Sequence, residues 1–288
     1  MNKSNIRNIC SVLLLIAVMS SCKTDEIAPP TVAEADTTGG QQPNSPKASP
    51  VVHSLNWDAY ADQTYTNANA AADFGTLTGW KEQRTIISGK TLRVKLEKNA
   101  LSSAGGIVAN INLEEGSEYE VEFKARFHSQ FDWSKGGKIG FGFRIGEGNT
   151  GCDKADDGNG GSARMMWYTS GNGDVKFKPY LYYKDMPDDC GSGFNSAYPS
   201  TGSVEKGVWY TIKIYVKSNT ASNTDGRVKF SVDGNTVLDK AIRWTTNDSK
   251  RLINKLSFST FRGGSTPDWQ SATEGYIYFD DLKWIKLN

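Results

Sequence analysis

The sequence has 288 residues and a formal net charge of +1, and charged residues make up 23% of it. This balance excludes a global electrostatic attraction to nucleic acid, so any polyanion has to be recognised by a local patch. The length suits one large domain or two small ones, and a β domain of about 230 residues can bury a core without help.

The N-terminus has the features of a bacterial export signal. Lys3 and Arg7 precede an apolar segment, 9–19, that is shorter than the roughly 20 residues needed to span a bilayer. Its ending, "MSSC", resembles a lipoprotein lipobox, so we expect a signal peptide over 1–21 and lipidation of Cys22. The "KTDE" that follows resembles an acidic surface-export tag, which predicts an outer-membrane lipoprotein, at the cell surface or facing the periplasm, held only by its lipid.

Residues 22–50 are rich in Pro, Thr, Ala and Gly and have no apolar period. Such a segment cannot bury enough surface to offset its ordering entropy, so we expect a flexible tether from the lipidated cysteine. The globular domain is expected over 51–288. It shows no repeat of 20 to 50 residues, which argues against a solenoid or propeller.

Period-two alternation dominates this globular part. It predicts strands in "TLRVKLE", "EYEVEFKARF" and "WYTIKIYVK", a hairpin turning at Asp233-Gly234, and two C-terminal strands, "KLSFSTF" and "GYIYFDDLKWIKL". Helical patterns are short, at 68–74 and 247–253. Many strands with Gly-rich turns predict an all-β sandwich of two antiparallel sheets, and the size indicates a jelly roll with a concave groove.

Three strands in the middle of the chain carry unusual polar faces. In "GGKIGFGFRIG", Lys138 and Arg144 share a face with two glycines, Gly140 and Gly142, which suits close approach of another chain. "SARMMWYT" places Ser162, Arg164, Met166 and Tyr168 on one face, and "KFKPYLYYK" does the same for Lys176, Lys178, Tyr180, Tyr182 and Lys184. Any single strand of this kind is an ordinary solvated surface. Together, without Asp or Glu, they predict a glycine-floored cationic groove.

The two remaining cysteines, Cys152 and Cys190, flank these strands in Gly/Asp-rich loops. An exported protein favours a disulfide between them over two free thiols. The disulfide would bring together Asp153, Asp156, Asp157, Asp188 and Asp189, which could hold a structural Ca²⁺ or simply be solvated. We expect no other cofactor. His128 ends one polar strand face and is interpreted as a solvated surface residue.

Five short motifs, "GGKIGFG", "GGSARMMW", "PYLYY", "STFRGG" and "YIYFDDLKW", resemble polysaccharide lyase family 14 in order and spacing. The family contains alginate lyases, and a related family cleaves glucuronan; both are jelly rolls. The resemblance implies an active-site lysine at Lys138, a Ser-x-Arg pair at Ser162 and Arg164, and a Tyr-x-Tyr pair at Tyr180 and Tyr182. With "STFRGG" it adds Arg262 to Arg144, Lys176 and Lys178 as expected substrate-binding residues.

The resemblance implies β-elimination on a polysaccharide rich in uronic acid, of the alginate or glucuronan type. Lys138 and Arg164 would neutralise the sugar carboxylate, with Ser162 in support. Nearby cations favour a phenolate, so Tyr180 or Tyr182 could be the base, and Lys138 is the alternative if burial lowers its pKa. A non-catalytic carbohydrate-binding jelly roll on the same scaffold stays open. The expected partner is an anionic polysaccharide, not nucleic acid, and the protein is expected to be a monomer.

Overall fold

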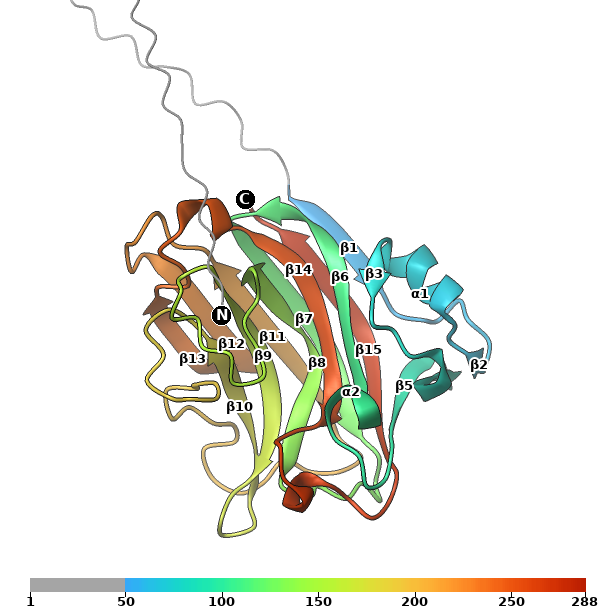
Figure 1. Cartoon of the computed structure of the whole chain (residues 1–288). Helices are drawn as coiled ribbons and strands as arrows, with labels where there is room; N and C mark the ends of the chain where they lie inside the picture. Colours follow the sequence, from blue (N-terminus) through green and yellow to red (C-terminus); the bar gives the residue numbers. More distant parts are fainter. Residues whose placement is uncertain (1–49) are drawn as a thin grey trace, which may run out of the picture. The chain divides into compact units, whose positions relative to one another are not determined.

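Two antiparallel sheets lie face to face in the computed structural model, which describes residues 50–288 (Figure 1). This architecture confirms the predicted all-β sandwich. The predicted signal peptide over 1–21, the predicted lipidation of Cys22 and the tether predicted over 22–50, except its last residue, lie outside the described residues. Among the described helices, none is long and apolar enough to cross a membrane.

The six-stranded sheet, here called the site sheet, has the order β10-β9-β8-β14-β6-β3. Its strands are β3 (Leu77–Thr78), β6 (Ile107–Gly116), β8 (Gly136–Gly146), β9 (Gly160–Thr169), β10 (Val175–Tyr182) and β14 (Ile253–Arg262). Pro179 lies within β10, which is tolerated because β10 is an edge strand of this sheet.

The nine-stranded sheet, here called the back sheet, has the order β13-β12-β11-β7-β15-β5-β4-β2, with β1 paired to β15. Its strands are β1 (Val51–Leu55), β2 (Gln63–Thr64), β4 (Thr85–Ser88), β5 (Thr91–Leu96), β7 (Glu118–Phe127), β11 (Trp209–Lys217), β12 (Gly226–Val232), β13 (Asn235–Ile242) and β15 (Gly275–Lys286). The predicted hairpin is present, because Asp233 and Gly234 both have positive φ between β12 and β13.

The core fills the space between the sheets with the apolar half of each alternating strand. Phe123 of β7, Phe141 of β8 and Phe279 of β15 are fully buried there, and their rings contact one another with centroids 5.4 to 6.2 Å apart. Burying side chains of this size contributes roughly 1.5–3 kcal/mol each, so the alternation drives the two sheets together. The same pattern turns the polar half of each strand outward.

Helices are few and short: α1 (Asn67–Phe74), α2 (Ser102–Gly105) and the 3₁₀ turns η1 (Glu82–Arg84), η2 (Asp248–Lys250) and η3 (Pro267–Trp269). The prediction over 68–74 is confirmed by α1, which begins at a capping box formed by Thr66 and Asn69. The prediction over 247–253 is wrong. The Asn247 side chain accepts from the Ser249 amide and closes a single turn, η2, before Ile253 begins β14.

Candidate active site

The polar faces of β8, β9 and β10 coincide on the outer surface of the site sheet. Cross-strand pairing sets Lys138 opposite Met166, and Met166 opposite Lys178, in one row. The next rows contain Arg164 with Tyr180, and Arg144 with Ser162 and Tyr182. Residues from three neighbouring strands therefore meet at one place, as the alternation predicted.

A cavity of about 600 Å³ lies over these rows. Its floor includes Lys138, Arg144, Arg164 and Met166. The rest of its lining includes residues 150–152 and 190–191 with Gly193, and Gly264, Ser265 and Trp269. Four cationic side chains line it, counting Lys178, and its described lining contains no Asp or Glu. An uncompensated positive cavity of this kind favours an anionic ligand.

Lys138 is a buried amine beside a phenol of the cavity. Its side chain is 6% exposed, and its Nζ lies 3.5 Å from the ring centroid of Tyr180. Burial, together with the charge of Arg164, holds the pKa of the Lys138 amine well below its usual value. A neutral amine is therefore available at a lower pH than for a solvated lysine.

Arg164 is 5% exposed and lies beside both phenols, with Cζ 5.5 Å from the Tyr180 ring centroid and 5.6 Å from that of Tyr182. Its Nε and Nη2 are buried without a hydrogen-bond partner among residues 50–288. Burial lowers the pKa of Arg164 to about 10, which leaves it cationic at neutral pH. Buried donors without acceptors are costly, so this guanidinium is suited to receive a carboxylate.

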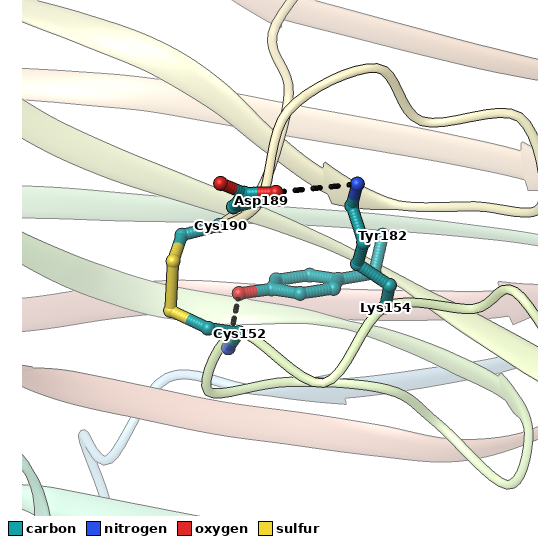
Figure 2. The surroundings of a disulfide bond; sticks show 5 residues. All are labelled: Cys152, Lys154, Tyr182, Asp189 and Cys190. Atoms are coloured by element: carbon teal, nitrogen blue, oxygen red, sulfur yellow. Dashed lines mark hydrogen bonds and ion pairs between the residues drawn. A yellow bond between two sulfur atoms is a disulfide. The ribbon is translucent and has the colours of Figure 1, made fainter.

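The two phenols differ in their contacts. Tyr182 is fully buried, and its hydroxyl accepts from the backbone N–H of Cys152 at 2.8 Å (Figure 2). Tyr180 borders the cavity, and burial and the Tyr182 hydroxyl raise its pKa despite the opposing charge of Arg164. The expectation that nearby cations lower the pKa of the phenol is wrong for Tyr180, because desolvation is the larger effect.

The expected disulfide joins Cys152 to Cys190 and connects the β8–β9 loop to the segment after β10 (Figure 2). An ion pair between Lys154 and Asp189, 3.3 Å apart, connects the same two loops. The acidic residues do not converge as the calcium hypothesis required. Within the described part of the chain, no three His, Cys, Asp or Glu side chains gather closely enough to hold a metal ion.

Three predicted site residues lie outside the cavity lining. The Ser162 hydroxyl donates to the Asn149 carbonyl at 2.8 Å, and so supports a loop rather than facing a ligand. Lys176 Nζ donates to the carbonyl of Pro199 at 3.0 Å. Arg262 is 1% exposed and donates to the Asp132 carbonyl, with its guanidinium over the Phe131 ring. The side chains of Ser162 and Lys176 are therefore bonded elsewhere. Arg262 keeps two buried donors, Nε and Nη1, without a partner among residues 50–288, but it lies outside the cavity lining.

The two glycines of β8 do not form the groove floor that was expected. Gly140 has φ +71°, and a Cβ there would lie 2.2 Å from the Phe123 ring, on the core side. A Cβ on Gly142 would lie 2.2 Å from the Ala163 carbonyl oxygen of the adjacent strand. Both positions fall within a register shift between β8 and β9 from Ile139 to Phe143. The glycines therefore allow a β-bulge, not the approach of a ligand.

Sequence reasoning did not nominate several residues that line the cavity. Met166 lies between Lys138 and Lys178, and its place in the alternation with Arg164 was a signal for it. Tyr168 and Trp269 pack against each other at a centroid distance of 6.0 Å and form part of the wall. Trp269 ends the 3₁₀ turn η3, far along the chain from the site strands, so no periodicity could have placed it here.

The family model for polysaccharide lyase 14 matches residues 85–282. The chain belongs to polysaccharide lyase family 14. That range contains the three site strands and the closing loops, so the cavity is the active-site candidate of the lyase.

Solved structures are similar over most of the lyase. Alginate lyase Aly36B is 55% identical, with a TM-score of 0.82 over 84% of this chain and 99% of Aly36B. The marine alginate lyase from Aplysia kurodai shares the fold, at 19% identity and a TM-score of 0.63 over 81% of this chain and 98% of its own. Exolysin from Paramecium bursaria Chlorella virus 1 is 31% identical over 170 residues, which cover 51% of this chain. The matched part spans only 26% of Exolysin.

Two further structures of Aly36B carry paired alanine substitutions and hold an alginate oligosaccharide. One replaces a lysine and a tyrosine and binds the tetrasaccharide; the other replaces a lysine and a methionine and binds the trisaccharide. The lyase has the same three residue types at the same mutual spacing along the chain, in Lys138, Met166 and Tyr180.

Proposed function

We propose that the lyase degrades alginate by β-elimination in the cavity of the site sheet. The observation that carries this proposal is the buried Arg164, whose guanidinium has free donors beside the amine of Lys138 in a cavity whose described lining has no acid. The choice of alginate is supported by the similarity to Aly36B and by the matching lysine, methionine and tyrosine.

The reaction defines what the site must supply. Removal of the C5 proton of a uronate leads to a C4=C5 double bond as the C4–O4 bond breaks, and O4 leaves with a proton. The charge that develops on the carboxylate has to be neutralised. Arg164 can pair with it through two N–H groups, and Arg144, whose Nε also lacks a partner in residues 50–288, lies in the adjacent row. Such preorganised donors contribute roughly 10²–10³ each to the rate.

Two observations favour Lys138 as the base. Tyr182 is fully buried with its hydroxyl bonded to the Cys152 amide, and the pKa shifts favour Lys138 over Tyr180. Burial lowers the pKa of the Lys138 amine and raises that of the Tyr180 phenol, so the reactive neutral amine is accessible and the phenolate is not. We assign the C5 proton to Lys138 Nζ, which becomes an ammonium ion. The same ammonium then returns a proton to O4, which restores the neutral amine.

The tyrosines are assigned supporting roles. Tyr180 stays protonated, so its hydroxyl can donate to the substrate. Its ring lies 3.5 Å from Lys138 Nζ, where it can stabilise the ammonium that forms when Lys138 takes the C5 proton. Tyr182 accepts from the Cys152 amide and fixes the edge of the cavity beside Arg164. Neither role requires a phenolate.

The test is an ultraviolet assay for new unsaturated ends on alginate, glucuronan and related uronates. We expect signal from alginate, a loss of at least about 10²-fold for Lys138→Ala, and smaller losses for Tyr180→Phe and Tyr182→Phe. Absence of signal from every uronate, with polymer binding retained, would support the non-catalytic binding module instead. Activity that survives in Lys138→Ala but disappears in Tyr180→Phe would move the base to the phenol.

We also propose that the lyase is an outer-membrane lipoprotein lipidated at Cys22. The support is the sequence "MSSC" after an apolar segment, followed by "KTDE". Cys22→Ala should shift the protein from the membrane fraction to the soluble fraction of cells and abolish incorporation of a labelled fatty acid. Membrane association that is unchanged by this substitution would refute the anchor.

A further inference from the structure

A row of alternating aromatic and arginine side chains crosses the outer face of the back sheet. Trp209 of β11 pairs with Arg126 of β7, Arg126 pairs with Tyr278 of β15, and Tyr278 pairs with Arg93 of β5. The alternate residues of these strands, such as Ala125 and Phe127 beside Arg126, are buried in the core. The row therefore lies on the side of the sandwich away from the cavity of the site sheet.

The rings hold the guanidinium groups by their flat faces. Arg126 Cζ lies 4.6 Å from the Trp209 ring centroid and 4.7 Å from that of Tyr278. Arg93 Cζ lies 5.0 Å from the ring centroid of Tyr276, the next outward residue of β15. Stacking of this kind leaves the edges of a guanidinium, where its five N–H groups are, free to bind an acceptor.

Neither arginine has a carboxylate partner of its own in the part of the chain that the structure describes. The lysines of the same strands do: Lys124 lies 2.8 Å from Asp281, Lys95 lies 3.0 Å from Glu97, and Lys213 lies 3.0 Å from Glu122. No side-chain hydrogen bond or ion pair involves Arg93 or Arg126 across residues 50–288. Arg93 and Arg126 are thus held in place by aromatic rings without a carboxylate partner in the described residues, while the lysines beside them form ion pairs.

The ligand that fits such a row is an anionic sugar chain. Guanidinium edges suit carboxylates, and the half-exposed aromatic rings between them offer apolar contact to a sugar ring. Arg93 and Arg126 are two strands apart, or roughly 10 Å, and every sugar of a polyuronate carries a carboxylate, so one chain can reach both. His128, whose ring lies 6.1 Å from that of Tyr276 and 6.3 Å from that of Tyr278, extends the row.

We propose that Arg93, Arg126, Trp209, Tyr276 and Tyr278 form a second, non-catalytic binding surface for a polyuronate, here called the back surface. The identity of its ligand rests on the proposed function, since it is the polymer that the cavity cleaves. A chain held there keeps further segments of the same polymer, or of its neighbours in a gel, at high effective concentration near the cavity. The back surface would thereby increase retention on long polymers.

The experiment measures binding without turnover. In a Lys138→Ala background, the affinity for alginate is compared by affinity electrophoresis with and without Arg93→Gln and Arg126→Gln. The matched control carries Arg227→Gln and Lys229→Gln, which remove two exposed cations that pair with Asp239 on the same sheet. We expect roughly tenfold weaker polymer binding for the first pair and less than a twofold change for the control.

Arg126→Lys provides a second readout. It keeps the charge but loses the flat, bidentate guanidinium. An intermediate loss of affinity with an unchanged Tm supports recognition by the back surface, whereas a purely structural role predicts a lower Tm. Unchanged affinity of the Arg93→Gln/Arg126→Gln protein, with thermal melting confirming a folded state, overturns the proposal. This comparison measures binding and not cleavage, so its result can be interpreted even if the ultraviolet assay shows no activity. Absence of activity would contradict the proposed function but not the back surface.

Discussion

At Lys138 the requirements of function oppose those of stability. The pKa of the amine is well below its usual value in the folded protein. At neutral pH the unfolded chain therefore binds a proton that the folded protein binds poorly, and this difference lowers the free energy of unfolding. Lys138→Met removes this penalty and fills a buried position. We expect a gain of about 1 kcal/mol or more, raising Tm by roughly 2–4 °C, together with loss of activity.

The pH dependence of this effect has a defined sign. As pH rises from the folded pKa of Lys138 toward its unfolded pKa near 10.4, the unfolded chain also loses its proton and the wild type regains the lost stability. The difference in the free energy of unfolding between Lys138→Met and the wild type should therefore become smaller. Thermal melting of both proteins across this range checks the prediction. A variant that melts below the wild type at neutral pH would contradict it.

Arg164 should control the pH profile as well as the rate. The guanidinium is the second cause of the lowered pKa of Lys138, so Arg164→Ala should raise that pKa and move the acidic limb of kcat/KM to higher pH. Loss of the carboxylate partner should also lower kcat by roughly 10²–10³. Arg262→Gln, which changes a buried arginine outside the cavity lining, is the control and should leave the limb in place.

The same residues show what sequence could and could not provide. Period-two alternation brought Lys138, Arg144, Arg164, Tyr180 and Tyr182 to one face, because neighbouring strands align their outward rows. It could not tell that Lys176 is bonded to a carbonyl or that Arg262 packs on Phe131, since these contacts come from distant loops. Nor could it decide whether burial or nearby charge governs the pKa of Tyr180.

Within β8, the bulge rather than the substrate explains Gly140. Its φ is +71° and an added Cβ would lie 2.2 Å from the Phe123 ring, so Gly140→Ala should cost about 2–4 kcal/mol and lower Tm by roughly 5–15 °C. Gly171→Ala, at a loop position with open space around it, should change Tm little. Equal melting temperatures for the two variants would mean that the bulge does not require glycine.

The bulge is also one of the places where the alternation of side chains failed to predict the structure of a strand. Strands with clean alternation, such as β7 and β11, were predicted because one face is core and the other is solvent. β1, which is mostly exposed, and β6, whose second half loses alternation, were missed. Across the bulge of β8, alternation assigned Gly140 to the groove, although its Cβ position faces the core.

The disulfide should matter for both stability and activity. It closes a loop with a sequence separation of 38, which should stabilise the fold by about 4 kcal/mol by lowering the entropy of the unfolded chain. It also holds the Cys152 amide in place to donate to the Tyr182 hydroxyl. The Cys152→Ser/Cys190→Ser variant should therefore melt lower and lose kcat on alginate even where it is fully folded. Asp189→Asn, which removes only the exposed ion pair to Lys154, should be nearly neutral.

At the scale of the whole molecule, the sandwich separates two kinds of surface. The core fixes both sheets, so the cavity on the site sheet and the back surface on the back sheet are held rigidly on opposite sides. Cleavage depends on Lys138 and Arg164, which are buried and have shifted pKa values. Binding at the back surface depends on half-buried cations, which salt screens more strongly. Salt should therefore weaken retention on polymer more than it weakens turnover of bound substrate.

A protein comprising only residues 50–288 should keep the Tm and the kcat/KM of the full chain on soluble alginate. Every strand of both described sheets and every lining residue of the cavity belongs to this range, and Aly36B matches 84% of the chain while being covered over 99% of its own length. Melting and ultraviolet assays on the two proteins check this directly. A drop of more than a few degrees, or a severalfold loss of kcat/KM, would show that residues 1–49 contribute to the folded lyase.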